Sequence, residues 1–155
     1  MLNQPVNNFT ATATSETKVQ LTDLAGQQVL LYFYPKDNTP GCTTESQDFR
    51  DLHDQFAAAN TVVFGVSRDS MRTHENFKAK HSFPFELISD TEETLCQQFD
   101  VIKEKNTFGK KHFGIERSTF LIDSKGVLRH EWRKVKVAGH AAEVLEAAQT
   151  LNTSN

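Results

Sequence analysis

The residues best suited to chemistry lie where an apolar run gives way to a turn, because a cysteine follows that turn. Residues 29–34 are apolar throughout, and Pro40, Gly41 and Cys42 come soon after them. A helix that begins here places Cys42 in its first turn, where backbone amides lack partners and stabilise a thiolate over a thiol. Pro40 fixes its own backbone angle and Gly41 permits a tight turn. We therefore expect the loop to present a reactive Cys42, rather than to bury an inert one.

A thiolate at a helix start can serve disulfide exchange, hydrolysis or peroxide reduction. Disulfide reductases of the thioredoxin type carry Cys-x-x-Cys, but Glu45 stands at the fourth position here. A cysteine hydrolase needs a histidine base beside the thiol. The chain has six histidines, and the sequence singles out none of them. The residues alone therefore disfavour a disulfide reductase and leave the other two reactions open.

Alternating strands and helices must hold this loop in place. Residues 29–34 and 61–67 are apolar runs of strand length, which is typical of strands covered on both faces. The segment 42–60 carries apolar residues at helical spacing. Residues 71–81 predict a second helix, with Ser70 as its cap. This order of elements is typical of an α/β protein.

The remaining segments complete the predicted layers. Residues 10–21 favour a short hairpin, and Asp90 with Glu93 has the spacing of a capping box at the start of a short helix. Residues 118–132 give the clearest hairpin pattern, and residues 141–151 an amphipathic helix. Together the segments predict a three-layer α/β fold around a mixed sheet.

Length and charge exclude several classes of protein. With no linker-like tract, residues 1–155 fit one domain. A net charge of -3 provides no overall positive field for nucleic acid. No stretch approaches the roughly 18 apolar residues of a membrane span, and the N-terminus lacks a secretory pattern. We expect a cytoplasmic protein whose two cysteines stay free thiols.

Other constellations predict no further site. The spacing of histidines and cysteines indicates no metal site. The lysine-rich segment 103–112 is typical of a solvated surface loop. Phe108 and Phe113 are predicted to be core residues.

The residues around Cys42 resemble those of the peroxiredoxin family. Pro35, Thr39 and Cys42 match its Pro-x-x-x-Thr/Ser-x-x-Cys motif. The longer segments 32–51 and 109–123 are similar to the PrxQ, or bacterioferritin comigratory protein, branch of that family. The resemblance spans most of the chain and implies a thioredoxin-like fold, with a central mixed sheet flanked by helices.

The resemblance also implies roles for the residues near the thiol. Cys42 attacks a peroxide and becomes a sulfenic acid, while Arg117 holds the thiolate and stabilises the leaving oxygen. Thr39 donates to the thiolate or accepts the peroxide proton, although a hydroxyl in a turn also bonds local backbone. Glu45 either orients Arg117 or is a solvated helix carboxylate. The expected catalytic residues are Cys42, Thr39, Arg117 and Pro35, with Pro40, Gly41 and Glu45 in support.

Turnover requires a second thiol to reduce the sulfenic acid. In PrxQ-type relatives the resolving cysteine stands at the place of Gln47, or in the next helix at the place of Lys78. Cys96 remains, and we expect a buried apolar residue there rather than a resolving cysteine. The hypothesis is a one-cysteine mechanism in which an external thiol, such as thioredoxin or glutaredoxin, reduces Cys42.

The sequence thus predicts a peroxidase that reduces hydrogen peroxide and small organic hydroperoxides at the expense of thiols. We expect no cofactor, no nucleic-acid or membrane partner, and a monomer or weak homodimer. The alternative is a thioredoxin-like binding or chaperone module in which Cys42 is unreactive.

Overall fold

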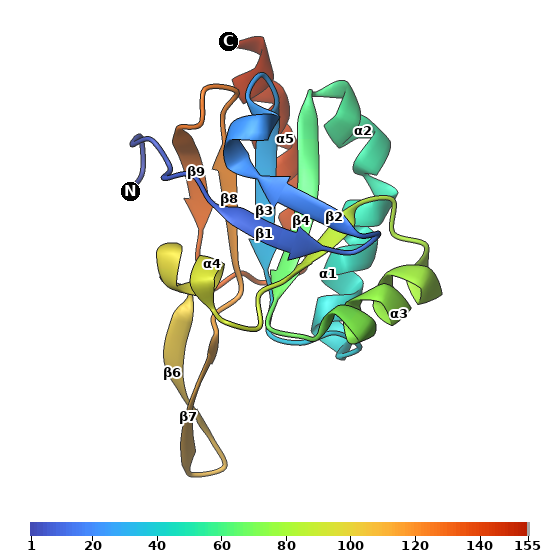
Figure 1. Ribbon diagram of the computed structural model, residues 1–155, viewed down its shortest axis with the longest axis vertical. Coiled ribbons are helices and arrows are strands. Elements are labelled where there is room, and N and C mark those ends of the chain that lie inside the picture. The colour runs from blue at the N-terminus through green and yellow to red at the C-terminus, as the bar shows by residue number, and fades with distance from the viewer. Residues whose placement is uncertain (155) are drawn as a thin grey trace.

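A mixed seven-stranded sheet forms the centre of the structure, a computed structural model that describes residues 1–154 (Figure 1). Its strands follow the order β2-β1-β5-β4-β3-β8-β9. Their bounds are β1 Thr10–Ala13, β2 Thr17–Gln20, β3 Gln28–Phe33, β4 Thr61–Ser67, β5 Glu86–Ser89, β8 Ser118–Ile122 and β9 Leu128–Trp132. β3, β4 and β5 are parallel, whereas β1 and β8 run antiparallel to their neighbours β5 and β3. The predicted α/β class with a mixed central sheet is confirmed.

β3 shows how the sequence pattern sets the layers. Leu31 and Phe33 enter one core cluster, whereas Leu30 and Tyr32 enter another. Successive side chains of a strand point to opposite faces of the sheet. A strand that is apolar at every position is therefore covered on both faces, as predicted for this segment.

Helices cover both faces of the sheet. The buried apolar residues of α1 (Pro40–Asp51), α2 (His53–Ala58), α3 (Met71–His81) and α5 (His140–Thr153) join the cluster of Leu30. The short helix α4 (Thr94–Gln98), the 3₁₀ helix η1 (Leu21–Leu24) and the β1–β2 hairpin cover the other cluster. Among residues 1–154, no helix is long and apolar enough to cross a membrane.

Several predicted elements are confirmed in detail. β1 pairs with β2, and β8 pairs with β9, both antiparallel. The hydroxyl of Ser70 accepts a hydrogen bond from the amide of Thr73 at 3.2 Å, so it caps α3 as expected. The amphipathic segment at the end of the chain forms α5.

The helix predicted over residues 42–60 is wrong at both ends and in its continuity. It begins at Pro40 and stops at Asp51, and a separate helix starts at His53. Leu52 breaks it, because the backbone there leaves helical geometry with ψ of 3°. The apolar spacing continues across the break, which conceals it in the sequence. The four-residue strand β5, which the sequence analysis does not predict, adds a further parallel neighbour to β4.

The segment predicted as a loop over residues 103–112 is a hairpin instead. β6 (Ile102–Thr107) pairs antiparallel with β7 (Lys110–Ile115), and the two form a sheet of their own. This hairpin extends away from the main sheet (Figure 1). Phe108 at its tip is fully exposed and Phe113 is also exposed, so their assignment to the core is wrong. An isolated two-stranded arm has little other chain to cover its aromatic residues.

The capping box predicted at Asp90 is also wrong in its register. The carboxylate of Asp90 accepts hydrogen bonds from the amides of Leu95 at 3.1 Å and Cys96 at 2.8 Å, so it does cap α4. Glu93, however, lies at the N-cap position in left-handed backbone geometry. Its carboxylate pairs with Arg68 at 2.8 Å instead of closing the box.

Candidate active site

Cys42 lies in the first turn of α1, directly after the loop that follows β3. Thr39 is the N-cap residue with extended backbone, and Pro40 is the first helical residue, where a missing amide costs nothing. Cys42 is only 2% exposed, beneath the exposed residues Pro40 and Gly41. The expectation that this loop presents Cys42 at the surface is therefore wrong. The helix turns the sulfur inward, toward the core cluster that contains Tyr32.

Arg117 connects Cys42 to Glu45. Its Nη2 donates to the sulfur at 3.3 Å, and its Nη1 donates to Glu45 Oε1 at 2.6 Å. Arg117 directly precedes β8, and the register of β8 on β3 sets Ser118 opposite Phe33. That register brings the arginine to the end of β3, close to the start of α1. Strand pairing thus joins residues that are 72 and 75 positions apart.

Burial gives this arrangement its electrostatic character. The side chain of Glu45 is 1% exposed and that of Arg117 is 16% exposed. Burial raises the pKa of Glu45 to about 7, although Arg117 acts in the opposite direction. Burial also lowers the pKa of Arg117, but Glu45 and Cys42 together bring it above its ordinary value. The guanidinium therefore stays protonated beside the sulfur, and Glu45 is not a solvated helix carboxylate.

One oxygen of the Glu45 carboxyl makes no hydrogen bond within the described residues. This atom, Oε2, is buried. A buried carboxylate oxygen without a donor favours the protonated form of the acid. This observation agrees with the raised pKa of Glu45.

Gly41 has a different role from the one predicted. It lies inside α1 and does not have a positive φ, so no tight turn depends on it. A Cβ atom at this position would lie 3.3 Å from Nη2 of Arg117. The absent side chain therefore makes room for the guanidinium next to Cys42.

The hydroxyl of Thr39 donates to the backbone carbonyl of Lys36 at 2.8 Å. This is the turn interaction considered above as the alternative. Since its proton is engaged, Thr39 does not donate to the thiolate here, but its oxygen lone pairs can still accept a proton from a peroxide. Pro35 is half-buried at the end of β3, whereas Pro40 is exposed.

A histidine base beside the thiol is not observed. Among the described residues, the hydrogen-bond partner of the Cys42 sulfur is Arg117. A cysteine hydrolase uses a neighbouring imidazole to remove the thiol proton. The geometry therefore disfavours the hydrolase that the residues alone left open.

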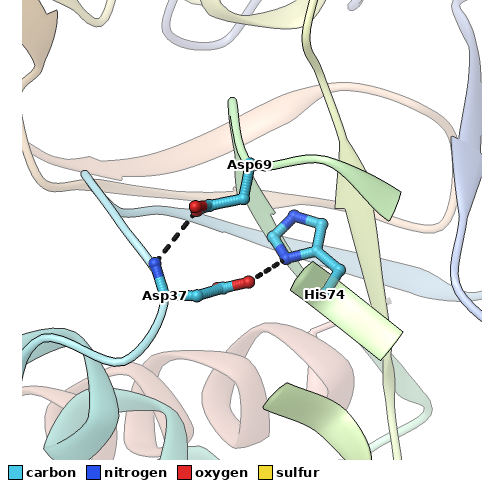
Figure 2. A group of neighbouring side chains, drawn as sticks. All are labelled: Asp37, Asp69 and His74. Atoms are coloured by element: carbon cyan, nitrogen blue, oxygen red, sulfur yellow. Dashed lines mark hydrogen bonds and ion pairs between the residues drawn. The ribbon is translucent and has the colours of Figure 1, made fainter. Parts of the chain in front are cut away.

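A second polar cluster, which no sequence pattern indicates, joins Asp37 of the same loop to Asp69 and His74 (Figure 2). Asp37, Asp69 and His74 place one ligand-type atom each within 4.8 Å of one another. Protein groups already engage these atoms: Asp37 Oδ2 lies 2.6 Å from His74 Nδ1, and Asp69 Oδ2 accepts from the Asp37 amide at 3.0 Å. The cluster is therefore a hydrogen-bond network that the protein satisfies from its own groups.

The two positions where PrxQ-type relatives carry a resolving cysteine hold Gln47 and Lys78, and the second thiol of the chain is Cys96. Cys96 is fully buried in the cluster on the other face of the sheet. Burial, with help from Asp90, raises the pKa of its thiol well above the usual range. Gln47 contacts His81 at 3.4 Å, and Lys78 pairs with Glu86 at 3.7 Å. The structure thus gives Cys42 and Cys96 separate surroundings.

An arginine held against a buried cysteine at a helix start, within a sheet covered on both faces, defines a thiol peroxidase with a thioredoxin-like fold. Comparison with known proteins agrees. The model of the AhpC/TSA family matches residues 2–131, and the chain belongs to this family of peroxiredoxins.

Several of the similar proteins carry the names PrxQ or Bcp. Peroxiredoxin Bcp of Xanthomonas campestris is 56% identical over 131 residues, which cover 84% of this chain and 82% of the relative. The putative peroxiredoxin bcp of Coxiella burnetii is 52% identical over 137 residues, covering 88% and 91%. A solved structure of X. campestris peroxiredoxin Q has a TM-score of 0.92, with 49% identity and 98% of each chain covered. The resemblance noted in the sequence is confirmed.

Proposed function

We propose that this peroxiredoxin reduces hydrogen peroxide and small organic hydroperoxides at Cys42, with Arg117 as the group that activates sulfur and peroxide together. The observation that carries the proposal is the pair of bonds from Arg117, one to the sulfur and one to the buried Glu45. A structure of the X. campestris relative is described in terms of its alkyl peroxide reduction activity. That description supports organic hydroperoxides as substrates here.

In the first half-reaction, the thiolate of Cys42 attacks one peroxide oxygen. A sulfur–oxygen bond forms and the oxygen–oxygen bond breaks, so the sulfur is oxidised to a sulfenic acid and the peroxide is reduced. The leaving oxygen takes up a proton and departs as water or an alcohol. Negative charge moves from the sulfur to this oxygen during the attack. Arg117 stabilises that charge by donating hydrogen bonds to the atoms that carry it. Thr39 can accept a hydrogen bond from the bound peroxide, because its own proton is engaged by the Lys36 carbonyl.

In the second half-reaction, an external thiol attacks the sulfenic sulfur. Water leaves, and a mixed disulfide with Cys42 forms. A second thiol then attacks this disulfide, which releases the oxidised reductant as a disulfide and returns the Cys42 thiol. Two observations support an external reductant. Cys96 is buried on the other face of the sheet, and Gln47 and Lys78 stand where PrxQ-type relatives carry a resolving cysteine.

We propose further details of the same function. The reductant is thioredoxin, glutaredoxin or a similar thiol, and residues 1–155 form one domain that acts in the cytoplasm as a monomer or weak homodimer. The two free cysteines support a reducing compartment.

The test is a single-turnover experiment on the reduced protein. One equivalent of hydrogen peroxide is added, followed by a reagent that traps sulfenic acids. We expect prompt labelling of Cys42 in the parent and in the matched control Cys96→Ser, and none in Cys42→Ser. Peroxide consumption by Cys42→Ser at the parent rate, or labelling at Cys96, would refute the assignment.

A further inference from the structure

We propose that Asp37 and His74 are positioning residues that hold the active-site loop closed, and that their bond favours peroxide attack at the expense of reduction. The inference rests on the proposed function, since it concerns the two half-reactions of Cys42. It arises from the cluster in Figure 2, which the chemistry described above does not use.

Asp37 ties the loop to α3, to the segment after β4 and to Tyr34 at the start of the loop itself. Its Oδ2 lies 2.6 Å from Nδ1 of His74 on α3, and its Oδ1 accepts from the hydroxyl of Tyr34 at 2.6 Å. Its amide donates to Asp69, in the segment after β4, at 3.0 Å. Asp37 lies two positions before Thr39, the N-cap of α1. These bonds therefore fix the approach of the chain to the turn of helix that carries Cys42.

The chemistry of His74 makes this bond strong. The imidazole is fully buried, and its Nε2 lies 3.0 Å from the carbonyl oxygen of Ile88. A carbonyl and a carboxylate only accept, so the imidazole donates to Ile88 through Nε2 and to Asp37 through Nδ1. Both side chains of the pair are 0% exposed, so water does not replace the bond. Hydrogen bonds to a charged partner of this kind are about twice as strong as neutral ones.

The two half-reactions require opposite states of the loop. Peroxide attack needs Cys42 in the closed state, where its sulfur lies 3.3 Å from Arg117. Reduction needs a thiol to reach the same sulfur, and Cys42 is only 2% exposed in that state. The loop must therefore open between the two steps. A bond that stabilises the closed state alone lowers the population that the reductant can attack.

Two substitutions of His74 separate this role from general stabilisation. In His74→Gln, the longer amide can keep the donor toward the Ile88 carbonyl at the Nε2 position, but the partner of Asp37 is lost. In the matched control His74→Asn, the shorter amide keeps a donor toward Asp37 at the Nδ1 position and gives up the Ile88 bond. Asp37→Asn, which retains an acceptor for Tyr34, weakens the same bond from the loop side.

The measurements are the rate of sulfenic acid formation with hydrogen peroxide and the rate of its reduction by dithiothreitol. One lost hydrogen bond to a charged group shifts the ratio of open to closed loop by about tenfold, so we expect the ratio of the reduction rate to the oxidation rate in His74→Gln to rise about tenfold. We also expect this variant to resist conversion to sulfinic acid at excess peroxide. His74→Asn should stay closer to the parent in both rates, and Asp37→Asn should shift both rates in the same directions as His74→Gln.

Several outcomes would overturn the proposal. These are a slowing of both half-reactions together, no change in either rate, and the same behaviour of the Asn and Gln variants of His74. If His74→Gln and Asp37→Asn both fail to fold, the pair serves the core rather than the loop. Failure of the proposed function is distinguishable, because in that case the parent protein itself forms no sulfenic acid at Cys42.

Discussion

Replacing Glu45 by glutamine tests whether this buried carboxyl holds a proton near neutral pH. Burial raises its pKa from 4.5 to about 7, so the folded protein binds this proton more tightly than the unfolded chain does. Glutamine has nearly the same shape but does not titrate. A comparison of the two proteins across pH therefore isolates the proton of Glu45 from other groups.

The size and sign of the effect follow from the two pKa values. An acid whose pKa is raised by folding adds most to the free energy of unfolding at pH values below its unfolded-state pKa. This contribution is lost as the pH rises through its folded-state pKa. One pKa unit corresponds to about 1.36 kcal/mol, so the rise from 4.5 to about 7 corresponds to about 3 kcal/mol. The side chain is 1% exposed, so solvent screening reduces this figure little. We expect the free energy of unfolding of the parent, relative to Glu45→Gln, to fall by about 3 kcal/mol between about pH 4.5 and about pH 7.5.

Urea unfolding of both reduced proteins at closely spaced pH values measures this difference. The exposed carboxylate of Glu104, replaced by glutamine, is the control, and it should alter the profile little because solvent screens it. A difference between the parent and Glu45→Gln that stays constant with pH would refute the argument from burial. A stability advantage of the parent that rises with pH up to about pH 4.5 and is flat above it would show that the ion pair with Arg117 keeps Glu45 ionised in the folded protein.

Three further substitutions have expected results. Gly41→Ala should slow sulfenic acid formation on the order of tenfold, because the new Cβ would lie 3.3 Å from Arg117 Nη2 and displace the guanidinium; rapid-quench trapping measures the rate. Cys96→Ser should leave that rate unchanged but lower the free energy of unfolding by about 1 kcal/mol, since it buries a hydroxyl in an apolar cluster; urea unfolding measures the loss. Phe108→Ser should change the free energy of unfolding by less than about 0.5 kcal/mol, because this side chain is fully exposed; a larger loss would show that the hairpin tip packs against other residues.

Local rules are sufficient to place Cys42 in the first turn of a helix, although they do not predict its burial. The apolar run before it, the proline at the helix start and the amides of the first turn are all properties of neighbouring residues. The bond from Arg117 to Glu45 is different, because the two are 72 positions apart and meet only through the register of β8 on β3. No local pattern contains that register, so only the family resemblance could supply Arg117.

The predictions failed where burial depends on distant contacts. Asp37 has the composition of a turn residue and His74 is one of six histidines, so neither stands out in the sequence. They become a buried pair because α3 packs beside the loop. Phe113 shows the reverse case, since an aromatic residue typical of a core lies on an isolated hairpin. In each case the residue type was clear, and the tertiary packing around it was not.

The placement of the two cysteines determines which oxidised forms one chain can reach. Cys42 packs with the helices on one face of the sheet and Cys96 with the cluster on the other. A disulfide requires Cα atoms within about 7 Å of each other, whereas a layer packed on a sheet lies about 10 Å from it. Pairing the two sulfurs would therefore require one core to open. Without added thiols, we expect peroxide to add one and then two oxygens to Cys42, as sulfenic and sulfinic acids. Intact-mass measurement distinguishes this from the loss of two hydrogens, which would show that a Cys42–Cys96 disulfide forms and that the fold opens far enough to permit it.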